Sequence, residues 1–243
     1  MNRLIELKKN NGRSPVLFVK ENLKYIIPLF VIIAGIYIML APFYSARQFE
    51  HIQRQALKAW ENAIITGEIA PLPVNEPSGY WAESTVTLGD FVNEGGVWEE
   101  DTNPSFTLNY LLNNMEGVLT IEKIDFRAVI LAPATKRNLD ISVCEVISSR
   151  VMGQVGNYVL AGHYSTIYGR HFNRVREIGI GDIITVENGR ESFDYQVTEI
   201  FSVEPSETWV MNDDNARRLI TIITCDYDTF PYNRLIVRGE IKK

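Results

Sequence analysis

The sequence is poor in the residue types that build metal centres and disulfide frameworks. Among 243 residues there are only two cysteines, Cys144 and Cys225, and three histidines, His51, His163 and His171. No CxxC or HExxH spacing occurs, so the pattern predicts no metal site, and we expect no cofactor. Outside the cytoplasm the two cysteines could form one disulfide, but a chain of this length buries a core that does not need it.

One long stretch of the sequence has no charged residue. Residues 25–46, YIIPLFVIIAGIYIMLAPFYSA, are long enough to cross a bilayer as a helix. The preceding segment carries a net charge of +4, whereas the whole chain carries −6. The positive-inside rule then predicts a cytoplasmic tail over 1–24, a transmembrane signal-anchor over 25–46 and an extracellular remainder. A cleaved signal peptide is the alternative, but its apolar region is usually shorter.

The segment after the apolar run, residues 47–105, divides into a helix and a linker. Apolar residues recur there at spacings of three and four, and Gly67 offers a helix end. These residues are Phe49, Ile52, Ala56, Trp60, Ala63 and Ile64. The proline-rich stretch 68–105 reads as a linker or an extended segment over the domain surface, and 76–101 as a possible lid over a groove.

From residue 117 onward the pattern is typical of strands. Seven runs rich in β-branched and aromatic residues are separated by polar turns: GVLTIEKI, FRAVILAP, NYVLAGH, DIITVEN, SFDYQVTEIFSVEP, RLITIITC and NRLIVRGEI. Helical pieces are expected only near 106–114 and 171–178. The fold class predicted is mainly β, a closed barrel of about eight strands with short helices.

The two cysteines differ in their setting, because Cys225 ends a strand and precedes the acidic turn DYD. A strand end holds a side chain firmly while the loop leaves it accessible, although a free cysteine is often only a packing residue. A nucleophilic thiol needs a proton carrier and an oxyanion donor. His163 also follows an apolar strand, and Arg234 opens the strand after Cys225. We interpret His51 as solvated and His171 as structural or on the surface.

The strings "VLAGHYS", "TIITC" and "NRLIVRG" resemble the sortases, the cysteine transpeptidases of Gram-positive bacteria. The resemblance covers about 117–243 and is greatest to the membrane-anchored class D, with class B-like features after the cysteine. Ile222 replaces the family's usual Leu, and ISVCEVISSRVMGQVGN replaces its usual Gly-x-Gly-His segment. The resemblance implies that 106–243 form a sortase-like barrel domain with Cys225, His163 and Arg234 as its catalytic residues.

The resemblance also implies a reaction and its partners. Cys225 would cleave a Leu-Pro-x-Thr-Gly-like sorting signal of a secreted protein through a thioacyl-enzyme. His163 would exchange protons, Arg234 would stabilise the oxyanion, and a cell-wall amine would accept the acyl group. The loop 204–218 would select the signal. The remaining expected partners are lipid around the N-terminal helix, without nucleic acid. The substrate-binding residues implied are Thr224, Trp209, Val210 and Met211.

Two other functions stay open at this point. One is a pilin-polymerising sortase, which often carries a lid with an Asp-Pro-aromatic motif and a second membrane span. The other is a non-catalytic binding module, tethered to a membrane, on the same barrel. Arg238 lies farther along the last strand and is interpreted as structural. Asp226 and Asp228 oppose a thiolate, so we expect them to face solvent or to pair with a base such as Arg234.

Overall fold

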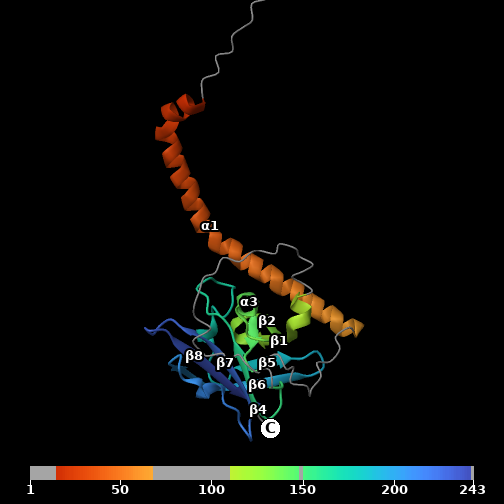
Figure 1. The fold of residues 1–243 in the computed structure, drawn as a ribbon. Helices are drawn as coiled ribbons and strands as arrows, with labels where there is room; N and C mark the ends of the chain where they lie inside the picture. The colour runs from red at the N-terminus through yellow and green to blue at the C-terminus, as the bar shows by residue number, and fades with distance from the viewer. Residues whose placement is uncertain (1–14, 68–109, 148–149, 242–243) are drawn as a thin grey trace, which may run out of the picture. The chain divides into compact units, whose positions relative to one another are not determined.

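The computed structural model describes residues 15–67, 110–147 and 150–241 (Figure 1). The chain divides into two compact units, Met1–Ser45 and Ala46–Lys243, and α1 (Pro15–Thr66) contributes to both. Residues 25–46 are helical, as predicted. A membrane span is not confirmed there: within the described ranges, no helix is both long and apolar enough to cross a bilayer.

The second unit contains a closed barrel of eight strands, as the alternating sequence patterns predict. Around the barrel the strands follow the order β1-β2-β3-β4-β7-β8-β6-β5. The pairs β2–β3 and β4–β7 are parallel, and the other neighbours are antiparallel. The strands are β1 (Met115–Ile121), β2 (Phe126–Leu131), β3 (Val143–Glu145), β4 (Gly156–Ala161), β5 (Ile183–Glu187), β6 (Ser192–Val203), β7 (Arg218–Asp226) and β8 (Asn233–Glu240).

Alternation along the strands separates the interior of the barrel from its outer surface. Ile220 and Ile222 of β7 belong to the large apolar cluster inside the barrel. Every strand contributes at least two residues to this cluster except β3, which contributes only Val143. Ile223 belongs to a second cluster on the other face of the sheet, together with Val159 of β4 and Ile236 of β8. Cys225 has the same parity as Ile223, so its side chain points to the outer face of β7.

Short helices connect the strands. They are α3 (Lys136–Ile141) and the 3-10 turns η1 (Glu122–Ile124), η2 (Val175–Glu177) and η3 (Thr208–Met211). Residues 110–114 are helical, within the predicted 106–114, whereas the helix predicted over 171–178 is reduced to the single turn η2. The predicted linker 68–105 and the possible lid 76–101 lie outside the described residues.

The C-terminal part of α1 packs on the outer surface of the barrel. The predicted apolar face is confirmed in part: Ala56 and Trp60 are buried against Val118 and Val129, whereas Ile64 is exposed. The helix ends at Thr66, where Gly67 has a φ of 71°, a conformation that glycine adopts without strain. This part of α1 belongs to the same compact unit as the barrel, and it covers the β1–β2 sheet next to α3.

Candidate active site

The three residues predicted to be catalytic come from three neighbouring strands. In the antiparallel pair β7–β8, Cys225 lies directly opposite Arg234. In the parallel pair β4–β7, Ala161 lies beside Ile223, and the Gly162 amide donates to the Ile223 carbonyl at 3.1 Å. His163, two residues past the end of that ladder, is therefore level with Cys225. The topology brings together residues that are far apart in the sequence.

These residues line one cavity. Cys225 is 8% exposed and Arg234 is 1% exposed, so both side chains are buried at the wall of the cavity. Such a site desolvates a bound carbonyl group and strengthens the charge interactions around it. The cavity is lined by Leu139, Ala161, Gly162, His163, Ile223, Thr224, Cys225 and Arg234.

The residue before His163 is a glycine, Gly162, and packing explains why. A Cβ atom built at Gly162 would lie 2.5 Å from the ring of Phe172, which is completely buried. Phe172 in turn packs against Phe126, with ring centroids 4.9 Å apart. The backbone before His163 can therefore approach the core only without a side chain at position 162.

The resting state of Cys225 is set by burial and by its neighbours. Burial raises the pKa of the Cys225 thiol, whereas the positive charge of Arg234 and a hydrogen bond with Tyr227 act in the opposite direction. The net direction is upward, which favours the protonated thiol before substrate binds. Formation of the nucleophile therefore requires a base, and His163 on the same cavity provides an imidazole.

Arg234 places a guanidinium group beside the thiol. Its Nη1 donates to the carbonyl oxygens of Tyr232 at 3.3 Å and Asn233 at 3.2 Å. Burial lowers the pKa of Arg234, whereas the neighbouring Cys225 and Tyr227 act to raise it. The arginine side chain nevertheless remains charged at any physiological pH. A buried cation directly across the strand from Cys225 is well placed to stabilise negative charge on an attacked carbonyl oxygen.

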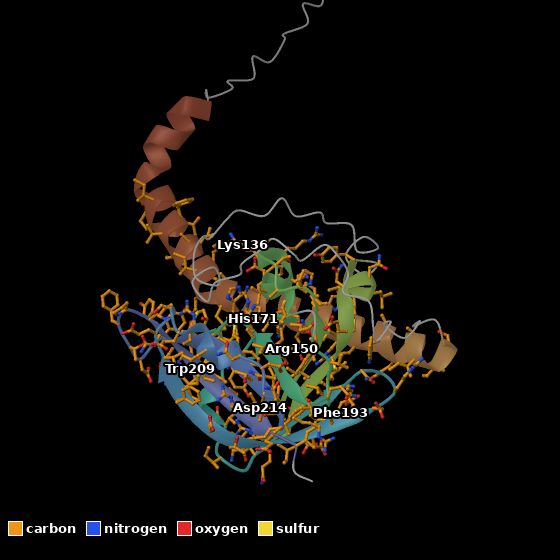
Figure 2. All side chains as sticks on the ribbon, turned by 60° about the horizontal axis from the view of Figure 1, so that its bottom comes forward. Lys136, Arg150, His171, Phe193, Trp209 and Asp214 are labelled. Atoms are coloured by element: carbon orange, nitrogen blue, oxygen red, sulfur yellow. The ribbon has the colours of Figure 1, made fainter. Side chains whose placement is uncertain are left out.

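His163 is in contact with one carboxylate and one second imidazole. Its Nε2 lies 3.2 Å from Asp140 Oδ1, and its ring meets the ring of His171 edge-on with centroids 5.6 Å apart. His171 (labelled in Figure 2) is 6% exposed, and burial lowers its pKa to about 3, helped by the charges of His163 and Arg170. His171 is thus a buried, neutral residue, in keeping with a structural role rather than a surface one.

The predicted selecting loop contributes one exposed aromatic side chain. Trp209 in η3 (labelled in Figure 2) is 46% exposed. Its ring stacks parallel to that of Phe201, with ring centroids 5.7 Å apart. The Arg238 guanidinium lies over both rings and pairs with Glu199 at 3.1 Å. Arg238 therefore fastens η3 to the outer surface of the barrel, consistent with its interpretation as structural.

The other two residues predicted in this loop are less exposed. Val210 is completely buried, packs with Ile223, and accepts hydrogen bonds at its carbonyl from Asn157 and Arg238. Met211 is half-buried and packs against the same cluster. Because Ile223 lines the cavity, this cluster continues the cavity's apolar wall. The side chain of Val210 itself has no surface to offer a ligand, which a loop sequence could not reveal.

Thr224 points to the face of β7 opposite to Cys225. It is 3% exposed, and its hydroxyl oxygen has no hydrogen-bond partner among the residues that the structure describes. Thr224 still lines the cavity beside the nucleophile. Its predicted contribution of a hydrogen bond remains a prediction.

The acidic turn after Cys225 pairs with a base, but that base is Arg176 rather than Arg234. Arg176 of η2 forms ion pairs with Asp226 and, at 2.6 Å, with Asp228. Asp226 also accepts a 2.6 Å hydrogen bond from the Ser202 hydroxyl. Burial raises the pKa of Asp226, but Ser202 and Arg176 outweigh it and lower the pKa overall. The charge next to the thiol is therefore neutralised by Arg176.

Other features of the described chain bear on metals and disulfides. Both cysteines are free. Within the described ranges no group of three or more His, Cys, Asp or Glu residues could hold a metal ion. In the loop 204–218, Asp213 pairs with Arg150 and Asp214 with Arg217 at 2.8 Å.

Sequence reasoning missed three residues around the site: Asp140, Arg176 and Tyr227. Asp140 lies in the stretch LAPATKRNLD, which belongs to the resemblance, but nothing in its spacing connects it with His163. Arg176 and Tyr227 likewise meet the site only through the tertiary fold. Tyr227 lies beside Cys225 and also lines a second depression, with His163 and His171, of about 340 Å³.

A cysteine at a strand end, with a histidine and a buried arginine on the flanking strands, defines a site for thiol-dependent acyl transfer. Comparison with known proteins agrees with this class. The family described as "Sortase domain" matches residues 119–242, just over half of the chain and within the predicted domain 106–243. The chain belongs to the sortase family. It is a cysteine transpeptidase, and not the non-catalytic module considered above.

Two of the proteins that the chain resembles are named sortase A. Sortase A of Bacillus anthracis is 23% identical over 222 residues, 91% of this chain and 96% of the relative. Sortase A of Listeria monocytogenes is 29% identical over 135 residues, which are 56% of this chain and 60% of the relative. Its crystal structure covers 54% of this chain and 88% of its own, at 28% identity and a TM-score of 0.50.

A member of another class is similar in fold. Sortase C1 of GBS pilus island 1 matches 54% of this chain and 65% of its own, at 23% identity and a TM-score of 0.50. Because sortases of more than one class resemble the chain, the relatives do not resolve its class. The predicted assignment to class D, with class B-like features, stays a prediction.

Proposed function

We propose that this sortase cleaves a Leu-Pro-x-Thr-Gly-like sorting signal and transfers the protein that bears it to a cell-wall amine. Cys225 Sγ attacks the Thr–Gly carbonyl carbon, and His163 takes the thiol proton and delivers it to the leaving amine of Gly. The C–N bond breaks and a thioester remains. An incoming amine then attacks the thioester, gives a proton to His163, and releases the Cys225 thiol, which regains that proton.

The observation that carries this proposal is the register of β4, β7 and β8. Cys225 and Arg234 are directly opposite each other, and His163 follows the strand that runs parallel to β7. The three side chains therefore share one cavity although they come from three strands. Arg234 supplies the cation for the tetrahedral oxyanion, and the raised pKa of Cys225 supports a role for His163 as its base.

The apolar wall beside this cavity supports a site for the Leu and Pro of the signal. Ile223 lines the cavity and packs in one cluster with Val210 and Met211. Trp209 adds an exposed indole ring at the edge of that cluster. In this proposal Val210 shapes the wall from beneath, whereas Met211 and Trp209 are the residues that touch the signal. Thr224 borders the thiol from the interior side.

The test uses the full-length protein and a library of Leu-Pro-x-Thr-Gly-type peptides. Intact-mass measurement is expected to show an adduct equal to the peptide's N-terminal part, and added amine acceptors are expected to remove it. Absence of an adduct with every peptide, while Cys225 stays reduced, would contradict the proposal. Full peptide turnover by a Cys225→Ala variant would contradict the mechanism outright.

The pilin-polymerising alternative differs only in the acceptor. It predicts that a lysine side chain on a protein subunit resolves the thioester faster than a small cell-wall amine does. Competition between the two acceptors in the same assay decides between them. The cellular place predicted from the sequence, single-pass in the cell membrane with the N-terminus in the cytoplasm, remains a prediction that rests on residues 1–46.

A further inference from the structure

Asp140, the carboxylate that contacts His163, has no role in the reaction proposed above. Asp140 Oδ1 is 3.2 Å from His163 Nε2, and the two side chains are 31% and 33% exposed. The other carboxylate oxygen, Oδ2, is buried and has no hydrogen-bond partner among the described residues. Within the described chain, the carboxylate of Asp140 is therefore directed at His163 and at no other donor.

The helix that carries Asp140 is held at its start by a buried network. Thr135 caps α3 by accepting a hydrogen bond from the Asn138 amide at 3.2 Å. The completely buried Asn138 side chain donates to the Pro133 carbonyl at 2.9 Å and accepts from the Tyr110 hydroxyl at 2.7 Å. Because the Asn138 side chain is completely buried and hydrogen-bonded, it fixes the position of the turn that precedes Asp140.

The end of α3 is fastened independently. Gln53 of α1 donates to the Ile141 carbonyl at 2.7 Å, and its side-chain oxygen accepts from the Val129 amide at 3.2 Å. Ser142, which follows, donates through its hydroxyl to the Val129 carbonyl. Asp140 thus lies between two fastened points, and its carboxylate reaches His163 from a rigid element, as a precisely oriented site requires.

A second ring also contacts the imidazole of His163. The neutral His171 ring meets it edge-on, and His171 itself rests against Phe49 at 4.5 Å between ring centroids. His171 has a φ of 48°, a left-handed conformation that is uncommon outside glycine. The imidazole of His163 therefore contacts both a carboxylate and the buried ring of His171, and these contacts restrict its rotation.

We propose that Asp140 is a positioning residue that fixes the orientation and the tautomer of His163, so that Nδ1 is the nitrogen that exchanges the catalytic proton. An ionised carboxylate only accepts hydrogen bonds, so the Nε2 atom facing it carries the proton. The neutral ring then has its lone pair on Nδ1. This inference rests on the proposed function, since it assigns an atom to the proton transfer of His163.

The pairing also acts after the proton has moved. When Nδ1 takes the proton of the Cys225 thiol, His163 becomes a cation, and Asp140 lies beside that cation. The two opposite charges attract each other while the thioester forms. The proton then leaves from Nδ1 to the departing amine, while Nε2 stays beside the Asp140 carboxylate. Asp140 is not among the residues that line the cavity with Cys225, so we expect the effect to fall on the rate rather than on binding.

The test combines kinetics with nitrogen chemical shifts of the histidines in the full-length protein. Asp140→Asn keeps the size of the side chain but lets the amide donate as well as accept. We expect kcat to fall about tenfold, the lower end for a hydrogen bond to a charged group because the pair is partly exposed, with KM unchanged. Asp140→Glu is expected to recover part of the loss. Glu61→Gln, which removes an exposed carboxylate from Arg127, is the control and keeps full activity.

The chemical shifts provide a readout that a merely structural role would not move. The sequence has only three histidines, so ¹⁵N labelling gives few signals, and His163→Gln identifies those of His163. Where the imidazoles are neutral, wild-type His163 is expected to be the Nε2–H tautomer, and Asp140→Asn a mixture. An Nδ1–H tautomer in the wild type, or an unchanged tautomer and kcat in Asp140→Asn, would overturn the inference alone. Full activity of His163→Gln would instead overturn the proposed function.

Discussion

The two cysteines of this chain are both buried, but the charged groups near them have opposite signs. Both are free, and both lie on strands of the same barrel, Cys144 on β3 and Cys225 on β7. Burial is the largest cause that raises the pKa of each thiol. Burial alone therefore does not distinguish a packing cysteine from a nucleophile.

The charged neighbours separate the two. Around Cys144 the nearest charges are the carboxyl groups of Glu116 and Asp140, which raise the pKa of its thiol further. Near Cys225 the charged group is the Arg234 guanidinium, which acts to lower the pKa of the Cys225 thiol. Cys144 is completely buried in an apolar cluster, whereas Cys225 opens onto the cavity with His163. We therefore expect access and a nearby cation, rather than depth, to distinguish a reactive thiol from a packing one.

The largest expected effect comes from removing the reactive thiol. Cys225→Ala is expected to reduce peptide turnover to background, a loss of more than about a thousandfold, because no other group on the cavity forms the thioester. Turnover is measured by the release of the C-terminal peptide fragment. The same variant is expected to lose alkylation by iodoacetamide, since buried Cys144 does not react in the folded protein. Substantial alkylation of folded Cys225→Ala would show that the contrast drawn here is wrong.

Replacing the guanidinium group beside Cys225 is expected to have the next largest effect. Arg234→Lys keeps a charge but loses the planar fork, and we expect kcat to fall about a hundredfold as an oxyanion donor is lost. Arg238→Lys is the matched control, because it lies on the same strand and pairs with Glu199 away from the cavity. Equal losses in the two variants would assign Arg234 a structural role only.

The carboxyl groups near Cys144 predict a dependence of stability on pH. Burial raises the pKa of Glu145 to about 11, helped by a hydrogen bond with Glu116 and by its charge. The folded state therefore binds the proton more tightly than the unfolded state, whose pKa is near 4.5. The contribution to stability is present below pH 4.5 and is lost as pH rises toward the folded pKa, by up to about 1.4 kcal/mol per pH unit.

Glu145→Gln tests this directly, since an amide is as neutral as the protonated acid. Urea unfolding at pH 6 and pH 8 is expected to show a smaller loss of stability with rising pH in the variant than in the wild type. Glu191→Gln, an exposed position, is the control and keeps the wild-type slope. If Glu145→Gln also keeps that slope, Glu145 is not held in its protonated form.

The smallest expected effect comes from the unreactive thiol. Cys144→Ala removes one buried sulfur atom and is expected to lower the free energy of unfolding by about 1–2 kcal/mol, with peptide turnover changed less than about twofold. Chemical unfolding and turnover of the same preparation measure both. A loss of turnover as large as that of Cys225→Ala, in a protein that remains folded, would contradict the assignment of Cys144 to packing.

Local patterns in the sequence were sufficient to predict much of the barrel and to select Cys225, His163 and Arg234, which the fold brings to one cavity. Strands such as β7 and β8 alternate clearly, and a short loop between Cys225 and Arg234 implied a hairpin that brings them together, as the register confirms. Three-residue β3 (Val143–Glu145) has too few positions to show alternation, so it was not predicted as a strand.

The contacts that the sequence did not predict are those made across the fold. Asp140 and Arg176 are polar residues in short helical segments, a setting in which most side chains are simply solvated. Only closure of the barrel brings Asp140 to His163 and Arg176 to the turn after Cys225. In the same way, the orientation of Val210 depends on how η3 packs, and a loop sequence carries no periodicity from which burial is read.

The most direct test of the account locates the acyl group after the full-length protein has reacted with a sorting-signal peptide. Tandem mass spectrometry of the digested thioacyl-enzyme is expected to find the peptide on Cys225 in the wild type and in Cys144→Ala, and on neither cysteine in Cys225→Ala. A peptide attached to Cys144, or an adduct that persists in Cys225→Ala, would contradict the claim that Cys225 is the nucleophile of this sortase.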